Sequence, residues 1–293
     1  MPEIMPDTRV RRGTARLAAA FQRLRRDPAA IAALALLATF ALLALLAPLV
    51  APYDPLAQPD PVRLQNRPPS WAHPLGTDPF SRDVLSRVLY GARVSLGVGV
   101  LAALLSTTLG AAYGAVAAWL GGLADSAMMR LVDACLGIPR VLVLLAVVAL
   151  WGRVSTLTLV LLLAGTGWFA TSRLARAEVR ALRERDFVHA ARALGTSEPR
   201  LLVRHVAPHL VPPLLVAATL AVGNVIALEA GLSYLGLGVQ PPAASWGSVM
   251  QDGADYVTTA WWTTAAPGIL IVLTVLAVNV LGDGLRDALD PRE

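Results

Sequence analysis

The residues of this chain that could do chemistry are few, and their spacing does not build a catalytic site. The sequence contains no lysine, so it lacks the Walker A lysine that holds the phosphates of ATP. His205 and His209 stand four residues apart, which suits a metal on one helix face. Pro208 interrupts that spacing, however, and the glutamate of an HExxH motif is missing. We therefore expect no metal site and no ATP site in this chain.

Nucleophilic catalysis has no sequence support either. The chain has no GxSxG elbow, and its single cysteine, Cys135, lies in or beside an apolar run with no base next to it. One cysteine also excludes any disulfide within the chain. The sequence thus predicts a protein that is not an enzyme and binds no cofactor of its own.

A polar segment between two strongly apolar runs has the pattern of a helix that meets a partner. Apolar residues recur there at i, i+3, i+4 and i+7 and share one face. The face consists of Phe187, Ala190, Ala191 and Leu194, and it is flanked by His189 and Arg192. Alanines let a partner approach the backbone closely, and arginines supply charge-assisted hydrogen bonds. The pattern leaves two interpretations open, a docking helix or an ordinary cytosolic loop.

The residues at the ends of this segment predict two helices around a glycine. Asp186 is placed to cap the first helix, and Gly195 is the residue type that most often ends a helix in the left-handed conformation. Thr196 or Ser197 can then cap a second helix that runs to Pro208.

The composition places all of these residues in a membrane protein. Hydrophobic residues make up 56% of the chain and charged residues 15%, and the mean hydropathy is +0.59. A helix that crosses the ~30 Å hydrocarbon core needs about 20 apolar residues. Five windows meet or approach that length: Ile31–Val50 and the stretches between Arg93 and Asp125, Arg153 and Arg173, His209 and Glu229, and Asp255 and Asp283.

A sixth span is predicted around Leu131–Leu150, where Pro139 should produce a kink. Arg140 interrupts this span, and it either snorkels toward the interface or lines a pore as a cation. Asn224 and Asn279 either hydrogen-bond between helices or line the pore. The five windows carry almost no acids or histidines, which disfavours a proton-coupled carrier.

The distribution of arginine predicts the orientation in the membrane. Seven arginines precede the first span, and eight lie between Arg173 and Arg204 against four acids, so both segments should be cytoplasmic. Residues 51–92 balance four arginines with four aspartates, and residues 229–264 carry three acids and no arginine, which fits the outer side. Six crossings satisfy all four assignments and leave both termini in the cytoplasm.

These assignments divide the chain into successive segments. They are a basic cytoplasmic segment 1–28, a first transmembrane helix 29–52, an outer proline-rich strap and pre-helix block 53–92, a transmembrane domain 93–285 and a cytoplasmic C-terminus 286–293. Within the transmembrane domain, 174–208 is the cytoplasmic segment and 229–264 is an outer loop.

The cytoplasmic segment resembles the EAA loop of ABC-importer permeases. That pattern runs Glu-Ala-Ala, three residues, Gly, nine residues and Ile-x-Leu-Pro, and Ala190, Ala191, Gly195 and Pro208 occupy the matching positions. The chain departs from it with His189 at the glutamate, His205 at the isoleucine and Ala207 at the leucine.

Three further stretches resemble one branch of that family, the dipeptide, oligopeptide and nickel permeases. Residues 73–96, 228–250 and 281–292 look like ordered blocks of the second, C-type membrane subunit, so the resemblance covers nearly the whole chain from the first span onward. It implies an all-α polytopic membrane protein with about six transmembrane helices in the type I ABC-importer permease fold.

The resemblance also implies partners and a role. A homologous second permease subunit would complete a translocation path for peptides or a small solute such as nickel, in a bacterial or archaeal cell membrane. Two cytosolic ATPase subunits using ATP and Mg, and an extracytoplasmic solute-binding protein, would serve it, with no nucleic acid involved. Phe187–Gly195 would be the coupling helix that docks on an ATPase.

Two alternatives stay open beside this interpretation. Glu229 and Trp246 of the outer loop are candidates for an outer gate near the binding protein, or the loop only packs the helix bundle. The chain as a whole is alternatively a secondary transporter or channel-like membrane protein that works without ATPase partners.

Overall fold

The computed structural model describes residues 24, 26–152 and 154–289, and this part of the chain is almost entirely helical, with no strand. The long helices are α2 (Pro28–Leu45), α4 (Val84–Leu120), α11 (Ala207–Tyr234) and α13 (Trp262–Leu289). The others are α3 (Ala47–Val50), α5 (Gly122–Leu136), α6 (Arg140–Trp151), α7 (Thr156–Gly167), α8 (Phe169–Arg183), α9 (Asp186–Ala193), α10 (Glu198–Arg200), η1 (Leu201–Val206), α12 (Trp246–Asp252) and η2 (Ala254–Tyr256). The all-α class is confirmed.

The number of membrane spans follows from helix length and hydropathy. In the described residues, α2, α4, α13 and the continuous helix Glu198–Tyr234 are each long and apolar enough to cross a bilayer. The pairs α5–α6 and α7–α8 meet the same criterion together and are bent by 76° and 45°. Counting each bent pair as one span gives up to six, in agreement with the predicted six.

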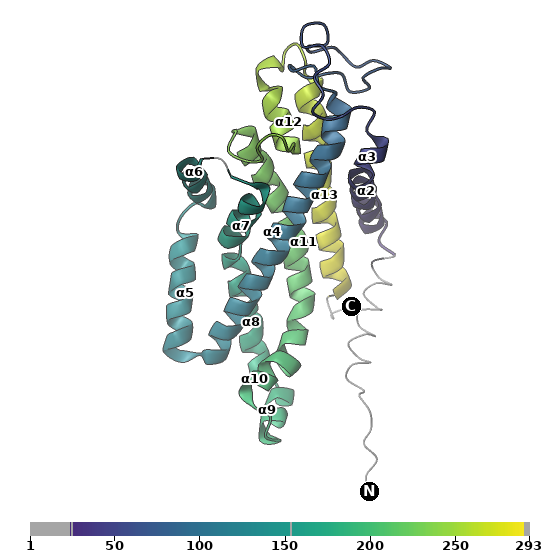
Figure 1. Ribbon diagram of the computed structural model, residues 1–293. Coiled ribbons are helices and arrows are strands. Elements are labelled where there is room, and N and C mark those ends of the chain that lie inside the picture. The colour runs from purple at the N-terminus through teal and green to yellow at the C-terminus, as the bar shows by residue number, and fades with distance from the viewer. Residues whose placement is uncertain (1–23, 25, 153, 290–293) are drawn as a thin grey trace.

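The helices form one elongated bundle with distinct ends (Figure 1). The loop after α3 and the short helix α12 lie at one end, and α9 and α10 lie at the other. Helix α4 runs between them and packs against α8, α11, α7 and α2. The last turns of α13 meet the start of α2, where Gly284 faces Ala30 and Asp27. The first and last described helices thus begin and end toward the same face, as an even number of crossings requires.

Parts of the predicted layout lie outside the described residues. They include most of the basic segment 1–28, Arg153 and the last residues, 290–293. The cytoplasmic location of the two termini therefore stays a prediction.

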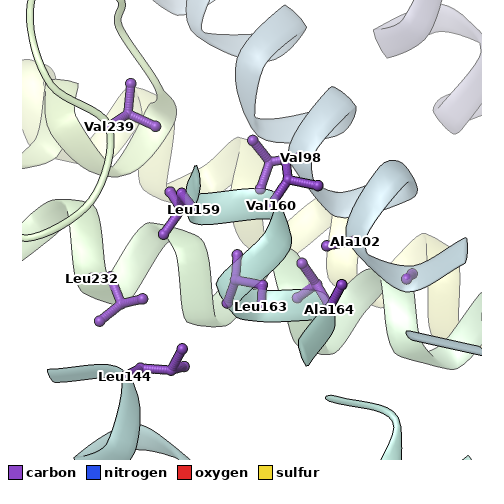
Figure 2. Close-up of a cluster of buried hydrophobic side chains, with 11 residues drawn as sticks. Val98, Ala102, Leu144, Leu159, Val160, Leu163, Ala164, Leu232 and Val239 are labelled. Carbon is purple, nitrogen blue, oxygen red and sulfur yellow. The ribbon is translucent and has the colours of Figure 1, made fainter. Parts of the chain in front are cut away.

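The main apolar core lies where α4, α6, α7 and α11 meet (Figure 2). Its members are aliphatic and small, and they include Val98, Ala102, Leu144, Leu159, Val160, Leu163, Ala164, Leu232 and Val239. Lipid tails are as apolar as these side chains, so close packing rather than escape from solvent must hold helices together in a bilayer. Close packing in turn requires small residues where backbones meet.

Two glycines supply that close approach between α4 and α8. A Cβ atom added at Gly114 would lie 2.0 Å from the carbonyl oxygen of Ser172, and one added at Gly110 would lie 2.5 Å from that of Trp168. Gly110 and Gly114 stand four residues apart on one helix face, the small-xxx-small spacing of packed membrane helices. They let α8, which leads into α9, pack directly against the backbone of α4.

Replacing Gly114 by alanine is expected to lower the free energy of unfolding by about 1–3 kcal/mol, because the methyl group overpacks a backbone contact. The matched control is Gly97→Ala in the same helix, where an added Cβ meets no atom within 4 Å. The control should be neutral or slightly stabilising, since alanine is the better helix former. Chemical unfolding in detergent measures the free energy of unfolding of both variants. Equal losses of stability in the two variants would contradict the close backbone contact at Gly114.

The helix predicted around Leu131–Leu150 breaks at Pro139, as expected. Helix α5 ends at Leu136 and α6 begins at Arg140, with Pro139 in the N-cap position. Proline cannot donate the next helical hydrogen bond and disfavours a helical conformation in the residue before it. The break places Arg140 in the first turn of α6, where its side chain reaches α7.

Several predicted element boundaries differ from the structure. Asp186 is not a cap: Arg185 holds the N-cap position of α9, with no side-chain cap bond, and Asp186 lies in the first turn. The second helix does not end at Pro208. This proline lies in the first turn of α11, where a proline is tolerated, and the π-helical segment η1 leads directly into that turn.

The two segment boundaries nearest the predicted outer side also differ. The first helix, predicted over 29–52, is divided at Leu46 into α2 and α3 and ends at Val50. The outer loop begins after Tyr234 rather than at Glu229. Glu229 can stay inside α11 because Ser233, one turn later, donates a hydrogen bond to its carboxylate.

Candidate functional site

The α9 hairpin, residues 186–206, is built around a left-handed glycine. Gly195 has a φ of +82°, a conformation that glycine adopts without strain. Its N–H donates to the carbonyl of Arg192 (2.9 Å), and the N–H of Thr196 donates to that of Ala191 (3.2 Å). This pair of bonds is a Schellman motif, and it turns the chain from α9 into the next helix. Gly195 therefore ends α9 in the left-handed conformation, as predicted.

An ion pair spans the same turn. Nε of Arg192 donates to Oε1 of Glu198 (2.7 Å), and a terminal nitrogen donates to Oε2 (3.1 Å). Hydrogen bonding to Glu198 raises the pKa of Arg192. Arg192 or Arg185 was expected to pair with acids at the rim of a partner's groove. In the structure the fork of Arg192 pairs with the carboxylate six residues away. Among the flanking arginines, Arg185 remains exposed.

The predicted apolar face of α9 is divided between the bundle and the surface. Val188 is fully buried with Val179 and Val206, and Ala191 is buried beside it. Phe187 is half-buried and stacks on His209, with ring centroids 5.2 Å apart. Leu194 is 87% exposed, and His189 and Ala190 are exposed as well. The surface that a partner can reach is therefore His189, Ala190 and Leu194, while Phe187 and Ala191 hold the helix on the bundle.

The two histidines of the segment do not converge on a ligand. Nδ1 of His209 is hydrogen-bonded to the backbone carbonyl of His205 (2.9 Å). Pro208 is exposed in the first turn of α11, between them. Within the described residues no group of three His, Cys, Asp or Glu side chains is arranged for a metal ion.

Helix α8 anchors this end of the bundle through buried charge. Asp125 of α5 is fully buried and accepts from Nε (2.6 Å) and a terminal nitrogen (2.7 Å) of Arg176, and also from Arg180. Arg183 donates to the carbonyls of Ala118 (3.1 Å) and Trp119 (2.9 Å), which end α4 without helical partners. Helix α8 is thus fastened to α4 and α5 immediately before α9.

A cavity of about 300 Å³ brings two of the predicted pore residues together. Arg140 of α6 and Asn224 of α11 both line it. The rest of its wall comes from α4, α8 and α11 and the end of α7, and consists of Ser106, Gly167, Ala170, Thr171, Leu174, Ala217, Leu220, Ala221 and Val225. Asn279 does not line it, but lies beside Gly223 on the neighbouring surface of α11 and α13.

The guanidinium of Arg140 is held by neutral acceptors. Nε donates to the hydroxyl of Thr166 (3.1 Å), and a terminal nitrogen donates to the carbonyl of Leu163 (2.7 Å). Gly167 leaves room for it, because a Cβ there would lie 2.9 Å from a guanidinium nitrogen. Arg140 therefore points inward, to the end of α7.

The other two candidates, Glu229 and Trp246, meet at a buried polar centre. Glu229 accepts from the hydroxyls of Ser233 (2.6 Å) and Ser95 (3.0 Å). The backbone N–H of Trp246 donates to the Ser95 hydroxyl (3.1 Å), and its indole N–H donates to the carbonyl of Val88 (3.1 Å). Trp246 is only 1% exposed, so it fixes α12 to α4. The predicted role of Glu229 and Trp246 in an outer gate stays a prediction.

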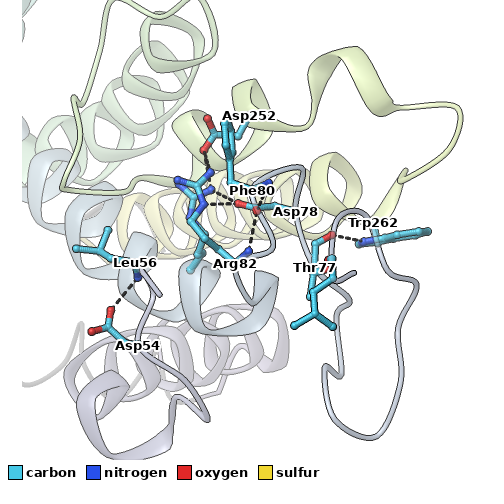
Figure 3. Close-up of polar contacts among 10 residues, drawn as sticks. Asp54, Leu56, Thr77, Asp78, Phe80, Arg82, Asp252 and Trp262 are labelled. Carbon is cyan, nitrogen blue, oxygen red and sulfur yellow. Dashed lines mark hydrogen bonds and ion pairs between the residues drawn. The ribbon is translucent and has the colours of Figure 1, made fainter. Parts of the chain in front are cut away.

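A largely buried ionic cluster at the predicted outer end, here named the outer latch, consists of Asp78, Arg82, Arg87 and Asp252. Figure 3 labels Asp78, Arg82 and Asp252 of this cluster. Asp78 Oδ2 accepts from Arg82 (2.6 Å) and Arg87 (2.7 Å), and Asp252 Oδ2 accepts from the same two residues (2.8 and 2.6 Å). Nearby, the indole N–H of Trp262 donates to the carbonyl of Thr77 (3.1 Å). These contacts join the strap, the start of α4, α12 and α13.

Comparison with known families decides what this bundle is. Residues 95–293 match the family described as binding-protein-dependent transport system inner membrane component. Residues 16–69 match the N-terminal TM domain of oligopeptide transport permease C. The chain belongs to this family of transport permeases. Its bundle is accordingly the type I importer permease fold, in the cell membrane.

Individual relatives agree with the family assignment. The permease is 39% identical over 274 residues to the dipeptide transport system permease protein DppC of Bacillus subtilis, covering 93% of this chain and 85% of the relative. It is 42% identical over 283 residues to a protein named as a peptide permease in Brucella suis, covering 95% and 92%. Another Brucella suis protein, named as a peptide transport system permease, is 44% identical over 231 residues, covering 79% and 77%.

Several polar contacts of the permease could not be predicted from the sequence. The outer latch and the Asp125 anchor join residues that lie far apart in the sequence. Ser95 is a single hydroxyl within an apolar run, and Ser106 begins the short hydroxyl run Ser106-Thr107-Thr108. One signal could have found the anchor, because Arg176 and Arg180 stand four apart and so share a face of α8.

Proposed function

We propose that this permease is one of two non-identical membrane subunits of an ATP-driven peptide importer. A homologous permease, two cytosolic ATPases that use ATP and Mg, and an extracytoplasmic solute-binding protein would be its partners. The α9 hairpin carries the proposal, because it presents a short exposed helix face at one end of a bundle whose sequence lacks a phosphate-binding lysine. Peptide is the proposed substrate because the relatives are named for peptide transport.

The anchoring of the hairpin suits the transmission of motion. Val188 and Ala191 fasten α9 to the bundle, and α8 is held to α4 and α5 through Asp125 and Arg183. Movement of a partner against Leu194 would therefore be transmitted to the transmembrane helices, because α9 is packed firmly against them.

The path from the hairpin to the opposite end is a single helix. Residues Glu198–Tyr234 form one continuous element that begins at the Gly195 turn and carries Asn224 and Glu229. Glu229 contacts α4 through Ser95, which also binds α12. Tilting this helix would open or close the cavity and the outer end together, which is the geometry that alternating access requires. The chain itself would do no chemistry.

Reconstitution with the partner subunits tests this function. In proteoliposomes that contain both permeases, both ATPases and the binding protein, uptake of a labelled dipeptide should require ATP and survive an uncoupler. Omitting the ATPases should abolish the uptake. Uptake that persists without ATP and disappears with the uncoupler would refute the proposal in favour of a secondary transporter.

A further inference from the structure

We propose that the cavity lined by Arg140 and Asn224 is a carboxylate-binding site on the translocation path, which holds a peptide by its C-terminal carboxylate. This role rests on the proposed function, since an imported peptide would bring that group to the cavity.

Charge is the first reason for the assignment. In the described part of the chain, both hydrogen bonds of Arg140 go to neutral oxygens, on Thr166 and Leu163, and no carboxylate forms an ion pair with it. A guanidinium carries five N–H donors, so at least one terminal nitrogen is left for a ligand. A cation in the hydrocarbon region is costly without a counter-charge, and such residues mark substrate pathways.

Orientation is the second reason. Thr166 and Leu163 hold the guanidinium on one side, and Gly167 lies against it on α7. The planar fork is thereby fixed before a ligand arrives, and it matches the two oxygens of a carboxylate. Because the side chain is already ordered, binding loses little rotamer freedom.

The rest of the wall fits the remainder of a short peptide. Asn224 supplies an amide that can both donate to and accept from a peptide bond, and Ser106 and Thr171 add hydroxyls. Leu174, Leu220 and Val225 form an apolar surface for a side chain. The volume of about 300 Å³ is at the lower end of small-molecule sites, which favours short peptides.

The cavity lies beside inner positions of two candidate membrane spans, α4 and the helix that contains α11. Ser106 lies about 21 Å along the α4 axis from Leu120, and Asn224 lies about 15 Å along α11 from Tyr234. Both positions lie inside helices that are long and apolar enough to cross a bilayer, Val84–Leu120 and Glu198–Tyr234. A ligand would reach this point only during transit.

Site-specific photolabelling tests the assignment without relying on transport. A photoreactive residue replaces Ala221 in the complete transporter in nanodiscs, and labelling by L-alanyl-L-alanine is compared with labelling by its C-terminal amide. The free acid should label at about tenfold lower concentration, because a charge-assisted pair is lost in the amide. In Arg140→Gln the two probes should label equally, and Asn279→Ala, outside the cavity, should behave as wild type.

The possible results separate this site from the general function. Co-purification of Arg140→Gln with the second permease and the ATPase subunits shows that the complex still assembles, and the acid and amide comparison in the unsubstituted chain needs no variant. Equal labelling by acid and amide in the unsubstituted chain would overturn the site even if ATP-driven uptake is normal. A phospholipid adduct that peptide does not displace would also overturn it. Acid-selective labelling without ATP-driven uptake would retain the site and reject the importer.

Discussion

Replacing Gly195 by valine is expected to lower binding-protein-stimulated ATP hydrolysis about tenfold in the reconstituted importer, because a β-branched residue resists the left-handed turn between α9 and the next helix. The φ of +82° costs an ordinary residue about 1–2 kcal/mol, and 1.4 kcal/mol corresponds to a factor of ten. Loss of the turn would shift Leu194 and the Arg192–Glu198 pair relative to the bundle. The proposed ATPase contact would then be misplaced.

Asparagine at the same position is the matched control. It tolerates the left-handed region far better than valine, so Gly195→Asn should retain most of the activity. An added Cβ at Gly195 meets no atom within 4 Å, so a steric clash within the chain cannot explain a difference between the variants. Full activity in both variants, with normal assembly, would contradict coupling through this hairpin.

Replacing Arg87 by methionine is expected to lower the free energy of unfolding by about 3–5 kcal/mol, the cost of removing one partner from a buried ionic group. Arg87 is 4% exposed and binds both Asp78 and Asp252. Its loss leaves Arg82 as the remaining cation of the outer latch. Chemical unfolding in detergent measures the change, and amide hydrogen exchange over residues 76–83 should rise.

Arg63→Met is the matched control on the same strap. Arg63 pairs with Asp60 at 3.8 Å, and its side chain is 85% exposed. Exposed pairs of this kind contribute about 0–1 kcal/mol, so this variant should unfold almost as the unsubstituted chain does. Equal losses in the free energy of unfolding of Arg87→Met and Arg63→Met would contradict the prediction that burial makes the ion pairs of the outer latch more important for stability than an exposed pair.

Local sequence determined much of this permease. Hydropathy and length predicted about six spans, Pro139 predicted the break between α5 and α6, and Gly195 predicted the left-handed turn after α9. Each of these rests on the chemistry of one residue or a short run: a missing N–H, a missing Cβ, or enough apolar length to cross a bilayer. Such preferences act within a turn or two and do not need the rest of the fold.

Only the tertiary structure decided which polar side chains meet. Arg140 was predicted to snorkel or to line a pore, and its position in one cavity with Asn224 follows from the packing of α6 and α11 around α7. The same holds for Arg87 with Asp252 and for Asp125 with Arg176, whose partners come from different helices. In an apolar interior each buried charge must find a partner. Helix packing selects that partner, and packing depends on contacts between residues far apart in the chain.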